Sequence, residues 1–248
     1  ATMPKTIMEL SKEFMKDYKL IKTMSDEDLK PDITEYATIA RENEKLETLV
    51  GFLDVQNPNL AIVFGRTKRR VDELASALIA KGYLAEGLHG DITQSKRLEI
   101  LRKFKNNSLQ ILVATDVAAR GIDISDVTHV YNFDIPQDVE SYTHRIGRTG
   151  RAGKSGVAIT FLNPVEMPYL KDIENSRGER MKMLRPYSQE EVKKSRNNRL
   201  FEEVISEMDK NHVEFNSLAN KLLSETNAEK VITILLSKLI TDKKDVDV

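Results

Sequence analysis

Three arginines spaced three residues apart carry the clearest chemical signal in the sequence. Arg145, Arg148 and Arg151 lie in the segment 144–151, which contains two glycines and no acidic residue. Guanidinium groups pair well with phosphate oxygens, and glycines allow a backbone to approach a ligand closely. The segment therefore suits a polyphosphate, although spaced arginines more commonly form a solvated helix face.

Other polar residues follow the ends of two expected strands. They are Arg66 and Thr67 after 60–64, Thr115 and Asp116 after 109–114, and Arg120, Gly121 and Asp123 in the next loop. Ligands of open α/β sheets bind where the strands end at their carboxyl edge. The Asp123 carboxylate could accept a ribose hydroxyl, which favours the phosphate interpretation of the arginines.

Two resemblances to nucleotide-binding motifs do not hold. Gly147 and Gly153 are separated by five residues, whereas a Walker A loop has four and follows a strand. Asp72 and Glu73 lie inside an expected helix, so we expect ordinary solvated acids there. We therefore expect no triphosphate cradle and no Mg²⁺-binding carboxylate.

The sequence shows no catalytic triad and no metal-ligand spacing. Cysteine is absent, which excludes disulfides and zinc–cysteine sites. We expect no metal site, and we interpret His89, His129 and His212 as structural or exposed.

Strand and helix patterns alternate from residue 32 to residue 163, which predicts parallel β-α units. We expect strands at 33–39 on the sheet edge, and at 60–64, 109–114, 127–133 and 156–162, and helices at 42–55, 71–81, 93–104 and 138–146. Asp138 suits an N-cap, and Leu98, Leu101 and Phe104 are expected to face the core. The fold class is thus α/β, with helices on both faces of the sheet.

Beyond Pro164 the pattern is helical only. A short helix is expected at 167–175, and capping boxes begin at Ser188 and Thr226. The last helix, 231–240, is apolar nearly all round, so more than one of its faces should be covered. Its own helical bundle and a partner chain are both suitable covers.

Composition limits the remaining classes. The chain has 248 residues, of which 40% are hydrophobic and 31% charged, with a net charge of −1. Such a chain can form a core, but no segment is strongly basic, so a nucleic-acid partner must be recognised by local sites. No apolar run approaches the roughly 20 residues of a membrane span, and no signal peptide is visible. We expect a cytoplasmic protein with no membrane partner.

Five motifs in order resemble the C-terminal half of a DEAD-box ATP-dependent RNA helicase. They are Ile62-Val63-Phe64 with Thr67, His89-Gly90-Asp91 with Gln94 and Arg97, Thr115-Asp116, Ala119-Arg120-Gly121-Ile122-Asp123, and His144 to Arg151. Ala1-Thr2-Met3-Pro4 resembles the end of the motif that closes the first RecA-like domain. The sequence of residues 61–97 is most similar to that of the bacterial cold-shock DEAD-box helicases. This resemblance implies roles in the stress response and in RNA decay.

The resemblance implies a role for each motif residue. Arg148 and Arg151 would be arginine fingers for ATP, Asp123 would hold its ribose, and His144 would couple ATP to RNA. Arg66, Thr67, Gly90, Gln94, Arg97 and Thr115 would contact the RNA backbone, and Asp116, Arg120, Gly121, Arg145 and Gly147 would support the motifs or the domain interface. ATP and Mg²⁺ would be cofactors of the full-length enzyme. Because the first-domain motifs are missing from the sequence, we expect no bound cofactor and no hydrolysis by these residues alone.

The resemblance also implies three regions. Residues 1–31 would be a remnant of the first RecA-like domain and a linker, 32–165 the second RecA-like domain, and 166–248 a small all-α dimerisation module. The expected dimer interface consists of Ile232, Leu235, Leu236 and Leu239. Partners would be RNA, the first RecA-like domain, a second copy of the chain and RNA-decay enzymes.

Two alternatives stay open at this point. One is a DNA helicase of the same superfamily, and the other is a non-catalytic assembly module that docks a helicase to RNA-decay partners. The amino-acid sequence of segment 144–151 favours an RNA helicase over a DNA helicase.

Overall fold

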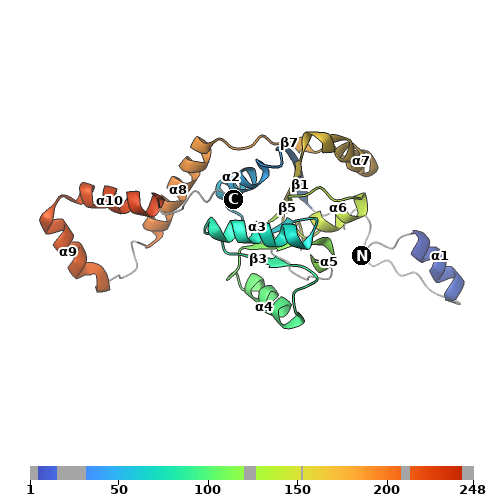
Figure 1. Cartoon of the computed structure of the whole chain (residues 1–248), viewed down its shortest axis with the longest axis horizontal. Coiled ribbons are helices and arrows are strands. Elements are labelled where there is room, and N and C mark those ends of the chain that lie inside the picture. The colour runs from blue at the N-terminus through green and yellow to red at the C-terminus, as the bar shows by residue number, and fades with distance from the viewer. Residues whose placement is uncertain (1–4, 16–31, 120–126, 152, 208–212, 242–248) are drawn as a thin grey trace. The chain divides into compact units, whose positions relative to one another are not determined.

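A computed structural model describes residues 5–15, 32–119, 127–151, 153–207 and 213–241 (Figure 1). The chain divides into two compact units, Ala1–Lys30 and Pro31–Val248. The first unit contains helix α1 (Lys5–Phe14). The motif expected at residues 1–4 and most of the expected linker lie outside the described residues.

The second unit is built on a seven-stranded sheet in which every pairing is parallel. Its strands are β1 (Ile33–Ile39), β2 (Ala61–Phe64), β3 (Ala85–Leu88), β4 (Ile111–Ala114), β5 (His129–Asn132), β6 (Gly156–Leu162) and β7 (Lys182–Met183). Their order across the sheet is β3-β4-β2-β5-β6-β1-β7. The predicted α/β class is confirmed.

Helices cover both faces of this sheet, as expected. They are α2 (Lys45–Gln56), α3 (Lys68–Ala80), α4 (Gln94–Lys105), α5 (Asp116–Ala119), α6 (Val139–Ile146) and, after the short turn η1 (Pro164–Glu166), α7 (Met167–Arg177). Alternate residues of a strand point to opposite faces, and β2 shows the result. Ile62 and Phe64 belong to one core cluster, whereas Ala61 and Val63 belong to the other.

Two helix starts confirm expected caps. The Asp138 carboxylate accepts a hydrogen bond from the Ser141 backbone N–H at 2.7 Å. Ser188 and Glu191 form both bonds of a capping box, at 3.3 Å and 2.8 Å. The expected cap at Thr226 is wrong by one residue, because Asn227 accepts the bond from the Lys230 N–H at 2.9 Å.

Three details of the sheet layer differ from expectation. Strand β3 was not predicted, because Glu86 and Gly87 interrupt its apolar pattern. Strand β1 is not at the edge, since β7 pairs with it on the outer side. Leu98 is 59% exposed, so its expected core position is wrong, whereas Phe104 is buried and Leu101 packs against the core as expected, and Ile100 enters the core in addition.

The segment 167–183 belongs with the sheet. Leu170, Ile173 and Met181 are buried in the core cluster that also contains Ile62, and β7 extends the sheet. The helical module expected from residue 166 therefore begins with a segment that completes the sheet domain. The division of the chain into three regions stays a prediction.

Three further helices follow: α8 (Gln189–Glu207), α9 (Asn216–Glu225) and α10 (Ala228–Thr241). Helix α8 contacts α2. Within the described part of the chain, no helix has the length and apolar character that crossing a membrane requires.

Candidate functional site

Five of the singled-out residues follow carboxyl ends of neighbouring strands. Arg66 and Thr67 follow β2, Gly90 follows β3, and Thr115 and Asp116 follow β4. Since β3, β4 and β2 are adjacent and parallel, these residues lie along one edge of the sheet, where ligands of such folds bind.

An ion pair between the buried Arg145 and the partly exposed Asp116 fixes the centre of this edge. Arg145 is 2% exposed, and its guanidinium binds the Asp116 carboxylate through two hydrogen bonds of 2.6 and 2.8 Å. A third bond of 2.6 Å goes to the Asp134 carbonyl, and the guanidinium carbon lies 5.0 Å from the Phe64 ring centre. Arg145 is thus fully engaged inside the protein. The hypothesis of three phosphate-facing arginines is wrong for this one.

Arg148 and Arg151 are the other two arginines, and both are partly exposed. Their Nε atoms donate to the carbonyls of His144 at 3.2 Å and Gly147 at 2.7 Å. Burial, and then the positive charge of Arg151, lower the pKa of Arg148. Two like charges held in this way gain stability from an anion, since an anion offsets their mutual repulsion.

A small pocket lies beside Arg148. Its lining residues are Phe64, Asp116, Ala119, Ser141, His144, Arg145 and Arg148. The Nδ1 atom of His144 is buried and has no hydrogen-bond partner among the described residues. A buried polar atom normally has a partner, so the His144 Nδ1 is an exception among the described residues.

Gly147 ends helix α6, and a side chain there would have little room. A Cβ atom on Gly147 would lie 3.1 Å from the Thr143 carbonyl oxygen. Arg120, Gly121 and Asp123 lie outside the described residues, so the expected ribose contact stays a prediction. In the part of the chain that is described, no group of three or more His, Asp or Glu side chains could hold a metal.

The residues expected to contact RNA are held in different ways. The Thr67 hydroxyl accepts from the Arg70 N–H at 3.1 Å and caps α3. The Arg66 N–H donates to the Asp134 carboxylate at 2.8 Å, whereas its side chain is 46% exposed and lies 3.5 Å from Glu166. Arg66 and Thr67 are both exposed, and the Arg66 guanidinium keeps more than one acceptor within reach at the surface.

The remaining four expected RNA residues border one loop. Gly90 and Gln94 are exposed. Arg97 donates to the Ala118 carbonyl at 2.6 Å, and the N–H of the buried Thr115 donates to the Leu88 carbonyl at 3.2 Å. These bonds tie α4 to α5 and the end of β4 to the end of β3, directly before the loop that contains Gly90.

One contact in this region was missed from the sequence. Asp72 was expected to be an ordinary solvated acid, but its carboxylate lies 2.9 Å from Nε2 of His89. Asp72 and His89 are 17 residues apart, and the unpredicted strand β3 brings them together. Without that strand, nothing in the sequence pattern indicated the pair.

Comparisons with known proteins give the class of the protein. Residues 44–153 match the helicase conserved C-terminal domain. The chain is 38% identical to the Escherichia coli DEAD-box protein SrmB in its complex with regulator of ribonuclease activity A, with a TM-score of 0.61. The match covers 66% of this chain and 95% of that one. The chain therefore belongs to the DEAD-box family, and it corresponds to the C-terminal, RecA-like half.

A particular relative is similar over nearly the whole chain. The DEAD-box ATP-dependent RNA helicase CshA of Geobacillus kaustophilus (strain HTA426) is 48% identical over 245 residues, which are 99% of this chain and 52% of the relative. The chain thus spans about half the length of that protein. A DEAD-box protein of Methanococcus jannaschii is 43% identical, with a TM-score of 0.58, covering 74% of this chain and 49% of its own.

Proposed function

We propose that the chain is the second motor domain of an ATP-dependent RNA helicase, which unwinds or remodels RNA together with a first RecA-like domain. The observation that carries the proposal is Arg148, which lines a pocket at the ligand-binding edge of the sheet and interacts with a second positive charge, that of Arg151. The Arg145–Asp116 pair holds α6 and α5 on either side of that pocket.

Each residue that faces ATP has a separate role in binding or hydrolysis. ATP, with Mg²⁺ held by the other domain, would supply the phosphoryl group that is transferred to water. Arg148 and Arg151 stabilise the negative charge that develops on it, an effect worth roughly 10³–10⁵ in rate for arginine fingers. Asp123 holds the ribose. His144 binds the facing domain through its buried Nδ1.

The RNA-facing residues contact phosphates and sugars, which positions RNA without reading its bases. The set is Arg66, Thr67, Gly90, Gln94, Arg97 and Thr115. An enzyme of this kind binds RNA of any sequence, and a net charge of −1 does not prevent it because the basic contacts are local.

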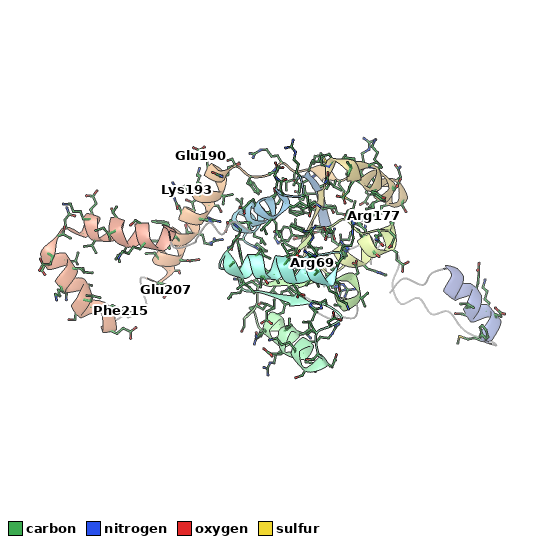
Figure 2. The ribbon with its side chains drawn as sticks, in the orientation of Figure 1. Arg69, Arg177, Glu190, Lys193, Glu207 and Phe215 are labelled. Atoms are coloured by element: carbon green, nitrogen blue, oxygen red, sulfur yellow. The ribbon has the colours of Figure 1, made fainter. Side chains whose placement is uncertain are left out.

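The test is ATP hydrolysis by the longer protein that carries both domains. Arg148→Ala and Arg151→Ala should each lower RNA-stimulated kcat by about 10³ or more. Arg69→Ala is the matched control, because Arg69 is an exposed arginine paired with Glu73 on α3 (Figure 2). The proposal would be contradicted if Arg69→Ala lost activity while Arg148→Ala and Arg151→Ala kept it. Stimulation of ATP hydrolysis by DNA as strong as by RNA would also contradict it.

The helices after residue 188 are proposed to form a homodimer. Their exposed apolar side chains include Phe201, Phe215, Leu218, Ile232 and Leu235, and Leu236 is partly buried. The Leu239 side chain lies outside the described residues. Such a surface suits a second copy of the chain better than water. We infer a cytoplasmic location for this assembly.

A second role is suggested by the SrmB complex, in which a relative is bound to a regulator of ribonuclease activity. The chain would then also dock the helicase to RNA-decay partners. Binding of a purified RNA-decay enzyme by the whole chain, but not by residues 1–187, would support docking through α8 to α10. Equal binding by both would contradict it.

A further inference from the structure

The loop after β3 is fixed by a buried histidine. His89 is 6% exposed, and its Nδ1 accepts a hydrogen bond from the Asp91 N–H at 3.3 Å. Because Nδ1 accepts, the ring proton of the neutral histidine is on Nε2. That N–H donates to the Asp72 carboxylate, 2.9 Å away, so both ring nitrogens are engaged.

Further bonds hold the same loop on its other sides. Lys68 of α3 forms an ion pair with Asp91. The Ile92 N–H donates to the His89 carbonyl at 3.2 Å, closing a tight turn. The loop is therefore held against α3, and the exposed Gly90 lies between the two residues that hold it.

We propose that Asp72 is a positioning residue for RNA binding: through His89 it holds loop 89–91 in the shape that presents Gly90 to the RNA backbone. This inference rests on the proposed function. Asp72 would repel RNA by its charge, and its side chain is 61% exposed. Its contribution to RNA binding is therefore the orientation of the His89 ring.

The matched control lies next to Asp72 in the sequence. Glu73 is also an exposed acid on α3, and its partner is Arg69 rather than the loop. Asp72→Ala and Glu73→Ala remove the same charge from the same helix, so a difference between them reports the contact with His89. Asp72→Asn keeps an oxygen that accepts from Nε2–H and should restore function.

The experiment measures RNA-stimulated ATP hydrolysis by the protein that carries both motor domains. Asp72→Ala should raise the KM for RNA by about five- to tenfold, the effect of losing one hydrogen bond, with kcat at saturating RNA unchanged. Glu73→Ala and Asp72→Asn should stay within about twofold of the unmodified protein. In the 248-residue chain, hydrogen exchange at the Asp91 amide should accelerate in Asp72→Ala only.

The outcomes separate the two proposals. If the unmodified protein shows no stimulation by RNA, the proposed function fails and this inference fails with it. If RNA stimulates the protein but Asp72→Ala behaves like Glu73→Ala, this inference alone is overturned. A fall in kcat with unchanged KM would also overturn it, because the loop would then act in hydrolysis.

Discussion

At the scale of single residues, the Arg145–Asp116 pair organises the site. Removing the Asp116 carboxylate leaves the buried Arg145 charge uncompensated. We expect Asp116→Ala to lower the free energy of unfolding by about 3 kcal/mol. Urea denaturation of the chain measures this. The exposed pair Arg69 and Glu73 is the control, and Glu73→Ala should cost less than about 1 kcal/mol.

The arginine segment shows how far the sequence predicts the site. Arg145, Arg148 and Arg151 were singled out as one phosphate-facing group, and their roles toward ATP stay predictions. The helix was expected to end at residue 146, and α6 does end at Ile146. Arg145 is therefore on the helix and points into the core, whereas Arg148 and Arg151 follow its end. Only the helix boundary separates a buried role from an exposed one.

A second residue-scale prediction concerns pH. Burial lowers the pKa of His129 to about 4, whereas an unfolded histidine titrates near 6.5. The folded protein keeps His129 neutral, so the unfolded state alone gains the proton as pH falls from 6.5 toward 4. The free energy of unfolding should therefore fall with pH in that window, by about 2 kcal/mol between pH 7 and pH 5.

The matched measurement uses His129→Gln, which removes the titrating group. Denaturation of both proteins at pH 7 and pH 5 gives the difference due to this residue. If the free energy of unfolding falls equally in the parent and in the variant between pH 7 and pH 5, the fall is not caused by His129.

At the scale of elements, a buried carboxylate attaches α8 to α2. The Asp54 side chain is fully buried and accepts from Nε of Arg196 at 2.8 Å and from Arg199 at 3.3 Å. Close by, Phe52 packs edge-on against Tyr187, with ring centres 5.4 Å apart. These contacts fix the start of α8 on the sheet domain.

Asp54→Ala should release this attachment. We expect a loss of about 3 kcal/mol and faster hydrogen exchange along α8. Glu47→Ala is the control, because Glu47 is an exposed acid on the same helix, paired with Lys81. If α8 exchanges equally in both variants, the Asp54 contacts do not hold it.

The elements themselves were predicted unevenly. Strand β2 is a continuous apolar run and was recognised, as were the helices that start at capping residues. Strand β3 and the two-residue β7 have no apolar run of their own, and pairing with β4 and β1 decides their structure. The local sequence pattern identifies an element when its own residues favour that structure. Where they do not, pairing with a neighbouring strand determines whether the segment is a strand.

At the scale of the whole molecule, the dimer is the main prediction. Leu235 is 49% exposed on α10, and a lysine there should be tolerated by the monomer but not in an apolar interface. We expect Leu235→Lys to halve the mass measured by sedimentation. Lys230→Ala is a control on the same helix, and a parent chain that is already monomeric would contradict the dimer.

A separate prediction concerns the chain without its partner domain. The 248 residues should hydrolyse no ATP above background, because the fingers act on a nucleotide that the other domain binds. Phosphate release with and without RNA measures this. RNA-stimulated hydrolysis by the purified chain would overturn the assignment as half of an enzyme.

Strand β7 has a consequence for how the protein can be cut. It covers part of the outer side of β1, a seven-residue strand with apolar residues on both sides. A fragment that stops at residue 165 would leave the outer side of β1 without the pairing that β7 gives to Tyr36 and Ala37. Such a bare edge recruits strands from other molecules, so a fragment ending there should aggregate, whereas one that ends after α8 should remain dispersed.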